Sequence, residues 1–391
     1  MKSLSDCRVL IVDDAKSNLD LLVEGLKNDY KLSVALDGEM ALKAVAKHPP
    51  DLVLLDIVMP GMGGYEVCRR LRERPETAEI PIMFLSSLED VENKAKGFEA
   101  GANDYLTKPF EMLEVKARVH SLIKAKAYSD AAKEQIASEL RVARDIQRGI
   151  LPSDFSDVEQ AYGVNIDAVL QPAREVGGDL YGVRAAGPER LVLFLGDVSG
   201  KGIAASLFMV RAVSLARLLA QQIAEPECIL ARLNDELAAD NPSGMFVTLV
   251  CGIFTPGTGK LSLANAGQCR PLLLRSMEPP RWTIDKLGTA LGFETGIQYE
   301  RTDIYLREGD ALVFYSDGVT EAFNTKEECY GNEHILLDLN NTGSESASFI
   351  VRHLLASVGE FVGAAPQSDD IAILVFKPGR RKSGLTHGGG L

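Results

Sequence analysis

Short apolar runs alternate with helix-type segments over the first 124 residues, and this alternation narrows the possible folds more than any other feature. The runs are RVLIV (8–12), KLSVA (31–35), DLVLL (51–55), IPIMFL (80–85) and DYLT (104–107). Residues 17–28 and 38–47, between the first three runs, have apolar side chains at helical spacing. Strands and helices that alternate in this way predict a parallel sheet covered by helices. We therefore expect five strands and five helices in a parallel, doubly wound α/β domain over residues 6–124.

Polar side chains follow four of these strands at their carboxyl ends, the edge where open parallel sheets bind ligands. Asp13 and Asp14 come after the first strand, Asp56 after the third, Ser86 after the fourth and Lys108 after the fifth. The three carboxylates offer the hard oxygen ligands that Mg²⁺ prefers. With its charge screened by such an ion, Asp56 can attack a phosphoryl donor, and Lys108 and the Ser86 hydroxyl can bind the phosphoryl oxygens. Taken alone, an Asp pair after a strand is more often a helix cap, and Lys-Pro is usually a turn.

The joint pattern resembles the response-regulator receiver domain. It consists of VDD, LLDIVMPGMGGYEV, PIMFLSS and GANDYLTKPF, with intervals of 42 residues from Asp14 to Asp56, 30 to Ser86 and 22 to Lys108. The resemblance covers this whole domain, and every key position is filled. It implies that a cognate histidine kinase phosphorylates Asp56, that the site binds Mg²⁺, and that Tyr105 changes rotamer together with Ser86.

Residues 111–151 contain neither proline nor glycine before Gly149 and predict one long helix. One row with a period of seven holds Val115, Leu122, Ser129, Ile136, Ala143 and Ile150, and a second row holds Val119, Lys126, Lys133, Leu140 and Gln147. The rows are apolar at both ends and polar in the middle, so a solvated connector and a coiled-coil homodimer both remain open, with the dimer slightly favoured. We assign residues 125–151 to this linker.

Beyond residue 151 the pattern changes to glycine-rich strands and two helical stretches, residues 203–223 and 346–362. Strand candidates lie at residues 191–196, 246–254, 260–267, 270–275, 311–316 and 371–376. Turn sequences such as PGTGK and REGD predict hairpins, and hence an antiparallel α+β domain over residues 152–377. Residues 378–391 are basic and rich in glycine, and we expect a disordered tail.

Acidic residues of this second domain lie beside its apolar runs: Asp179, Asp197, Asp317 and the pair Asp369 and Asp370. Aspartates at strand ends can surround two hard cations at one rim of a sheet, and the Val198 carbonyl could add a ligand. Two Mn²⁺ or Mg²⁺ ions held there would activate water for hydrolysis of a phosphomonoester. Each motif alone is more often structural, because Ser-Asp-Gly and Gly-Asp are common in turns.

Together, VGGDLYG, LFLGDVSGKG, VFYSDGVTEA and SDDIAILVF resemble the metal-dependent type 2C protein phosphatase domain, in its bacterial stage II sporulation protein E subfamily. The resemblance runs from about residue 138 to residue 377, and it includes ELRVARDIQRGILP, which is similar to the helix that leads into that domain. It implies a β-sandwich flanked by helices and serine/threonine phosphatase activity. The implied ligands are Asp197 for both metals, Asp179 and Val198 for one, and Asp317 and Asp369 for the other, with Asp370 at a position that is not always acidic.

Three positions depart from that family's pattern. Lys201 stands where the family commonly has histidine, Gln268 replaces the histidine of NAGH, and Gly182 follows VGGDLY where aspartate is frequent. None of the three is an implied metal ligand. They therefore bear on substrate preference and rate more than on activity itself.

Two other functions fit parts of the sequence. VGGDLY is similar to the GGDEF signature of diguanylate cyclases, but a cyclase needs Glu-Phe at positions 180 and 181 and leaves the later aspartates unexplained. The stronger alternative is a phosphorylation-controlled adaptor or partner-switch protein with a catalytically weak phosphatase-like domain. Such degeneration normally removes metal aspartates, and all of them are present here.

The composition of the chain limits the kinds of binding partner and the cellular compartment that we expect. A formal net charge of −13 disfavours binding to nucleic acid or to anionic membranes. The N-terminal apolar run is too short for a signal peptide, and no stretch of 18 apolar residues follows. We therefore expect a cytoplasmic response regulator whose output is a phosphoserine/phosphothreonine phosphatase. By family resemblance, its substrate is an anti-sigma-factor antagonist in a partner-switching pathway.

Overall fold

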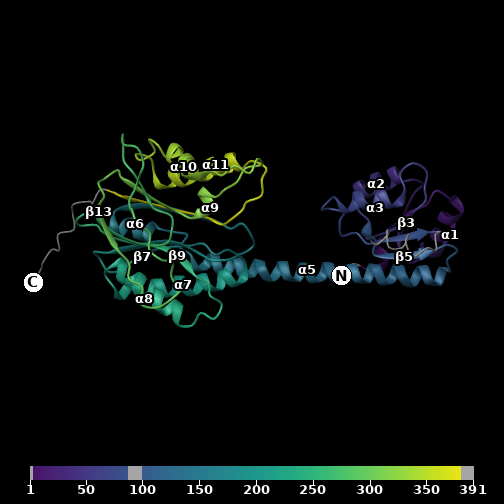
Figure 1. Cartoon of the computed structure of the whole chain (residues 1–391), viewed down its shortest axis with the longest axis horizontal. Coiled ribbons are helices and arrows are strands. Elements are labelled where there is room, and N and C mark those ends of the chain that lie inside the picture. The colour runs from purple at the N-terminus through teal and green to yellow at the C-terminus, as the bar shows by residue number, and fades with distance from the viewer. Residues whose placement is uncertain (1–2, 87–98, 380–391) are drawn as a thin grey trace, which may run out of the picture. The chain divides into compact units, whose positions relative to one another are not determined.

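The structure is a computed structural model that describes residues 3–86 and 99–379. It divides the chain into two compact units, Met1–Ser138 and Glu139–Leu391 (Figure 1). Helix α5 (Met112–Ile150) is continuous through the boundary between them. The expected long helix is therefore present, whereas the expected limits of the domains and the linker stay predictions.

The N-terminal unit is built on a five-stranded parallel sheet in the order β2-β1-β3-β4-β5. After the short helix η1 (Leu4–Asp6), its strands are β1 (Arg8–Val12), β2 (Lys31–Ala35), β3 (Leu52–Asp56), β4 (Ile82–Ser86) and β5 (Asp104–Thr107). The intervening helices are α1 (Lys16–Leu26), α2 (Gly38–Lys47) and α3 (Gly64–Arg72). This sheet confirms the expected α/β fold, while the helix expected between β4 and β5 lies largely outside the described residues.

Alternate residues of the central strands enter two hydrophobic clusters, one on each face of this sheet. Leu10 and Val12 of β1 pack with residues of α2 and α3, whereas Val9 and Ile11 pack with residues of α1 and α5. Because both faces are covered, these strands are apolar at nearly every position. The same arrangement leaves only the strand ends for polar side chains.

The C-terminal unit contains two five-stranded sheets in the orders β13-β10-β9-β8-β7 and β12-β11-β14-β15-β6. Their strands are β6 (Val164–Gln171), β7 (Leu180–Ala185), β8 (Leu191–Val198), β9 (Val247–Thr255), β10 (Lys260–Ala266), β11 (Leu272–Leu274), β12 (Arg281–Trp282), β13 (Arg301–Tyr305), β14 (Ala311–Tyr315) and β15 (Ile371–Pro378). All pairs within these sheets are antiparallel. The helices are α6 (Ser156–Tyr162), α7 (Ile203–Gln222), α8 (Pro226–Ala239), α9 (Asp317–Thr320), α10 (Gly331–Asp338) and α11 (Ala347–Val362).

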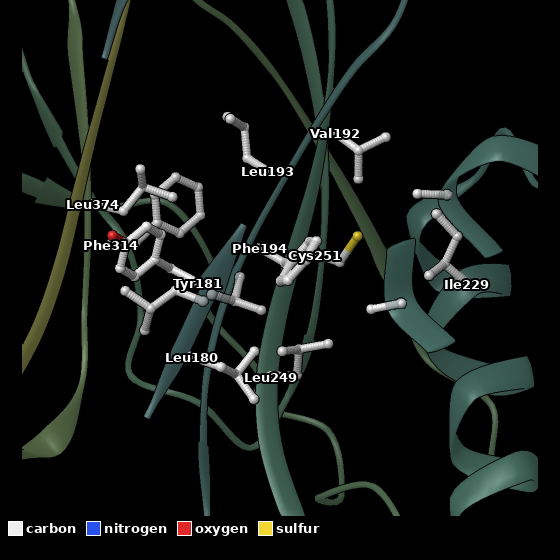
Figure 2. Packing of buried hydrophobic residues seen from close by; sticks show 14 of the residues in the cluster. Leu180, Tyr181, Val192, Leu193, Phe194, Ile229, Leu249, Cys251, Phe314 and Leu374 are labelled. Carbon is white, nitrogen blue, oxygen red and sulfur yellow. The ribbon is translucent and has the colours of Figure 1, made fainter. Parts of the chain in front are cut away.

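The two sheets pack face to face and are flanked by helices. Within this unit, α7 and α8 lie on one side of the sheets, and α10 and α11 lie on the other (Figure 1). Figure 2 shows Phe314 and Leu374 of one sheet facing Leu193 of the other, while Cys251 of β9 points toward Ile229 of α8. This four-layer arrangement confirms the expected β-sandwich flanked by helices.

Several elements differ from the sequence expectations. Strands β6, β7, β12 and β13 and helices α6, α8, α9 and α10 were not expected. Gly182 interrupts the apolar run of β7, and β13 is exposed along most of its length, so neither gives a strong strand pattern. Strand β15 continues through Pro378, one residue into the expected tail, and residues 380–391 lie outside the described part of the chain.

Helix α7 has a strongly apolar composition. In the described residues it is the one helix that is long and apolar enough to cross a membrane. Half of that stretch is buried within the C-terminal unit, where α7 contacts α8, β7 and β8. Core helices of globular domains commonly have this composition.

Candidate functional site

The first candidate site lies at the carboxyl ends of β1 and β3, which are neighbours in the parallel sheet. Each of Asp13, Asp14 and Asp56 offers one carboxylate oxygen, and these oxygens lie within 4.8 Å of one another. Asp13 is fully buried and accepts hydrogen bonds from the Asn18 side chain at 3.0 Å and from the Ala15 amide at 2.9 Å. The fold therefore brings together the three carboxylates that the sequence predicted as Mg²⁺ ligands.

Lys108 completes this site from the end of β5. Its Nζ atom lies 2.7 Å from an oxygen of Asp13 and 2.7 Å from an oxygen of Asp56. Burial raises the pKa of Asp56, although the hydrogen bond and charge of Lys108 oppose that shift. Burial lowers the pKa of Lys108, but its hydrogen bonds to Asp13 and Asp56 outweigh this effect and hold its pKa above the ordinary value. The three carboxylates and the ammonium group of Lys108 together carry a net charge of about −2. This charge and the carboxylate oxygens suit the binding of one divalent cation.

Ser86 and Tyr105 lie near this site on the last two strands of the sheet. Ser86 is completely buried at the end of β4, and its carbonyl oxygen accepts a hydrogen bond from the Lys108 amide at 2.6 Å. Tyr105 is aligned with Phe84 on the neighbouring strand and belongs to the same hydrophobic cluster. The positions suit the expected roles, but phosphoryl binding by Ser86 and the rotamer change of Tyr105 stay predictions.

The second candidate site lies at one end of the sandwich in the C-terminal unit, where strands of both sheets contribute acidic residues. Asp179 precedes β7, Asp197 and Val198 end β8, Asp317 follows β14, and Asp369 and Asp370 precede β15. Asp179 and Asp197 share a hydrogen bond, and Asp197 also interacts electrostatically with Asp317 and Asp369. The fold thus brings together aspartates that are up to 191 residues apart in the sequence.

The electrostatics of this cluster show that its negative charge is poorly compensated. Burial, followed by the charges of Asp317 and Asp369, raises the pKa of Asp197 to about 7. Burial and the charge of Asp197 raise the pKa of Asp179 well above its ordinary value, and burial raises that of Asp317. Clustered, half-buried carboxylates of this kind are suited to divalent cations, which supply the missing positive charge. The donor set therefore fits the expected Mn²⁺ or Mg²⁺ ions.

Gly178 allows the loop before β7 to approach the candidate ligands closely. A Cβ atom at this position would lie 2.7 Å from the Val198 carbonyl oxygen and 3.1 Å from Oδ1 of Asp197. Both distances are shorter than ordinary carbon–oxygen contacts, so a side chain here would displace one of the two groups. The glycine that precedes Asp179 is thus required by the geometry of the site itself.

Ser316 and Asp370 position the backbone around the aspartates. The Ser316 hydroxyl donates to Asp179 at 2.7 Å and accepts from the Ala372 amide at 2.9 Å. The Asp370 carboxylate accepts from the amides of Ala173 at 2.8 Å and Gly178 at 2.7 Å, one bond to each oxygen. Asp370 was expected among the metal ligands, and that role stays a prediction; in this structure both of its carboxylate oxygens accept backbone hydrogen bonds.

The three departures from the family pattern have distinct surroundings. Lys201 Nζ lies 3.0 Å from Asp369 and donates to the Ser368 carbonyl at 2.7 Å. Within the described residues, this is the one ion pair formed by the aspartates of the second site. Gln268 is buried, and its Nε2 atom has no hydrogen-bond partner in the described structure. A Cβ atom on Gly182 would lie 2.1 Å from the Phe194 ring, so this ring occupies the space of any larger side chain.

Gln147 of α5 also contacts this region, and sequence reasoning assigned it no such role. It is buried, and its side-chain amide donates to the Gly177 carbonyl at 2.6 Å and accepts from the Gly177 amide at 3.3 Å. Arg144, one turn earlier, forms an ion pair with Glu175 at 3.2 Å. The end of α5 therefore holds the loop that carries Gly178 and Asp179. The sequence held one sign of this contact. Gln147 is a polar residue at the otherwise apolar C-terminal end of the second row with a period of seven.

Two models of known protein families match separate parts of the chain. The model of the response regulator receiver domain matches residues 9–120, and the model of stage II sporulation protein E matches residues 187–378. The SiaA-PP2C domain of Pseudomonas aeruginosa has a similar fold, with a TM-score of 0.57 and 21% identity over 63% of this chain and 98% of that one.

Curated relatives match about a third of the chain. A probable cyclic di-GMP phosphodiesterase of Vibrio cholerae is 42% identical over 135 residues, or 34% of this chain and 31% of that protein. The response regulator MprA of Mycolicibacterium vanbaalenii is 37% identical over 159 residues, or 39% of this chain and 68% of that protein. The chain spans about a third of the length of the first of these relatives. The chain therefore belongs to the response regulators, and it joins a receiver domain to a domain of the stage II sporulation protein E family.

Proposed function

We propose that the output of this response regulator is metal-dependent hydrolysis of phosphoserine or phosphothreonine in a protein, controlled by phosphorylation of Asp56. The observation that carries the proposal is the cluster of four aspartates at one end of the sandwich, with too little positive charge to balance it. It occurs in a domain that matches the stage II sporulation protein E family and has the fold of a PP2C domain.

In this proposal the carboxylates of Asp179, Asp197, Asp317 and Asp369 and the carbonyl of Val198 hold two Mn²⁺ or Mg²⁺ ions. When bound, such ions supply a nucleophilic water and neutralise the charge of the phosphoryl group. The chain's own contribution is to fix the ligand geometry. The Ser316 hydroxyl orients Asp179, and Asp370 holds the Gly178 backbone against the Val198 carbonyl.

In the receiver domain, Asp56 would take the phosphoryl group from the phosphohistidine of a cognate histidine kinase. A bond forms between a carboxylate oxygen of Asp56 and phosphorus, and the bond between phosphorus and the kinase's imidazole nitrogen breaks. Asp13, Asp14 and Asp56 would hold the Mg²⁺ ion. Lys108, now shared between Asp13 and Asp56, is placed to bind a phosphoryl oxygen, together with the Ser86 hydroxyl.

Helix α5 supports the proposed coupling between the two chemistries. Val115 and Val119 near its start are fully buried in the core of the N-terminal unit. Gln147 near its end is hydrogen-bonded to Gly177, next to the candidate metal ligands. A shift of α5 on phosphorylation would thus change the loop that carries Asp179. Insertion of two glycines near Ala132 should break the regulation while leaving each chemistry intact, and unchanged regulation would refute this coupling.

The substrate class and compartment rest on family membership. Proteins of the stage II sporulation protein E type suggest a phosphorylated anti-sigma-factor antagonist as substrate, within a partner-switching pathway in the cytoplasm. We also propose that two copies of the chain form a homodimer through α5. It is supported by exposed apolar residues on the helix, since Ile136, Val142 and Ile146 are each more than half exposed.

The test is phosphate release from a phosphoserine protein and from a generic phosphomonoester, with Mn²⁺ or Mg²⁺. The expected result is metal-dependent turnover that Asp197→Ala abolishes. Asp285→Ala is the matched control, because Asp285 is exposed and lies outside the acidic cluster. Absence of turnover in the wild-type protein under all these conditions would refute the enzymatic proposal.

A second candidate function is a phosphorylation-controlled adaptor with a catalytically weak phosphatase-like domain. The observation that favours it is the ion pair of Lys201 with Asp369, since an ammonium group at a candidate ligand competes with a metal ion. In that case the wild-type protein binds its phosphorylated partner without releasing phosphate. The same assay, combined with a partner-binding measurement, separates the two functions.

A further inference from the structure

A pocket of about 440 Å³ lies beside the acidic cluster, and Asp317 forms part of its wall. Arg270, which carries the opposite charge, lines the same pocket. Trp282, Tyr315, Leu287 and Leu336 give it an apolar surface. The pocket therefore combines a candidate metal ligand, a permanent positive charge and space for side chains of a protein substrate.

The segment that carries Arg270 lies directly against the aspartates. It follows β10 and includes Cys269, whose thiol interacts electrostatically with Asp317 and Asp179. Arg270 itself interacts with Tyr315, which immediately precedes Ser316 and Asp317. Arg270 is thus near the end of β14 where the acidic cluster is formed.

Arg270 has no ion pair or hydrogen bond with any residue that the structure describes, although it is half-buried. Two other arginines of this unit are paired: Arg275 with Asp310 at 3.2 Å and Arg301 with Glu227 at 3.3 Å. A guanidinium group has five N–H donors and stays charged at any relevant pH. Its donors in the pocket are therefore available to a ligand.

We propose that Arg270 binds the phosphoryl group of the phosphorylated residue in the substrate protein, on the side of the pocket that adjoins Asp317. This inference rests on the proposed phosphatase function, because it assigns a substrate contact to that site. A phosphoryl group offers three acceptor oxygens that match the planar donor fork of arginine. Cations bound by the aspartates would offset the negative charge of the pocket, so anion binding at Arg270 should require Mg²⁺ or Mn²⁺.

The charges around Arg270 support a metal-dependent anion site over a permanent one. Glu321 and Glu333 also line the pocket, and both are exposed. Together with Asp317 they make the metal-free pocket negative overall, which disfavours any anion. Two divalent cations at the aspartates would reverse this balance and leave Arg270 as a second contact for the phosphoryl oxygens.

Trp282 provides a direct test, because it is the single tryptophan of the chain and lines this pocket. Inorganic phosphate is titrated into the full-length protein in Mg²⁺, with tryptophan fluorescence as the readout and sodium chloride of equal ionic strength as the blank. We expect a saturable change in the wild type and a dissociation constant about 10- to 100-fold higher in Arg270→Ala, as for the loss of hydrogen bonds between charged groups. Arg270→Lys should fall between them, because lysine cannot form the bidentate pair.

Arg281→Ala is the matched control, since Arg281 is exposed and is the direct neighbour of Trp282 in β12. It should bind phosphate as the wild type does. Equal affinity in Arg270→Ala and Arg281→Ala, or no saturable change in the wild type, would overturn the assignment.

A turnover measurement separates this inference from the proposed function. Arg270→Ala should raise the KM for the phosphoprotein by a similar factor, whereas metal binding measured by calorimetry stays unchanged. Wild-type turnover with an unaltered KM in Arg270→Ala would overturn the role of Arg270 and leave the phosphatase function intact. Phosphate binding that depends on Arg270, without any turnover, would overturn the phosphatase function alone.

Discussion

The acidic cluster of the C-terminal unit should be a source of instability until cations bind to it. Asp197 is the most informative residue, because burial and its acidic neighbours raise its pKa from 3.8 to about 7. Asp197→Asn keeps nearly the same shape but removes the charge. We therefore expect this variant to be more stable than the wild type in metal-free buffer, although it has lost a candidate metal ligand.

The magnitude and sign follow from the pKa shift. One pKa unit corresponds to about 1.4 kcal/mol, so a shift of about three units corresponds to about 4 kcal/mol. Asp179 shares a hydrogen bond with Asp197, so part of this cost belongs to both residues, and we expect about 2 to 4 kcal/mol for Asp197. Because the pKa in the folded state lies above that in the unfolded state, the penalty is absent below about pH 4, grows as the pH rises, and is complete above about pH 7.

The assay is urea unfolding in EDTA, followed by the fluorescence of Trp282, which reports on the C-terminal unit alone. The advantage of Asp197→Asn should increase between about pH 5 and about pH 8. Saturating Mg²⁺ should stabilise the wild type and not the variant. Asp285→Asn, at an exposed position, should match the wild type throughout. A destabilised Asp197→Asn protein at the higher pH in EDTA would refute the reasoning.

Three further substitutions test individual contacts. Gly178→Ala should lower the affinity for Mn²⁺, measured by calorimetry, at least about 10-fold, because a Cβ atom would lie 2.7 Å from the Val198 carbonyl oxygen. Gly359→Ala is the control and should have no effect, because a Cβ atom at Gly359 would face open space. Lys201→Ala should raise Mn²⁺ affinity about 2- to 5-fold, as for the loss of a partly exposed ion pair, and lower affinity would contradict the proposed competition. Gln147→Ala should destabilise the C-terminal unit by about 1 to 3 kcal/mol in Trp282-monitored urea unfolding, and the exposed-site variant Arg148→Ala should not.

The receiver fold could be predicted because each central strand is buried on both faces. Such strands are continuous apolar runs: the predicted run at 8–12 coincides with β1, and the predicted run at 51–55 lies within one residue of β3. Strand β13 gave no such signal, because it lies at the edge of its sheet and most of its residues are exposed. Helix α8 was not predicted; it begins at Pro226, and proline is common in the first turn of a helix.

The residues of the candidate sites that lie at strand ends could be predicted from the sequence. Asp13, Asp56 and Lys108 are close in space because parallel strands end at one edge of a sheet. The contact of Ser316 with Asp179 joins residues 137 positions apart, and that of Gln147 with Gly177 joins a helix to a loop. No local pattern specifies such pairs, because they depend on how the two sheets and α5 pack within the C-terminal unit.

Control of C-terminal hydrolysis by the chemistry of Asp56 is the link that joins the two proposed activities. The most direct measurement compares phosphate release from a phosphoserine protein with and without beryllofluoride, which mimics a phosphorylated aspartate, in the wild type and in Asp56→Asn. We expect beryllofluoride to change the rate of the wild type and to leave that of Asp56→Asn unchanged. An equal rate in the wild type with and without beryllofluoride, under conditions where the enzyme is active, would contradict this link.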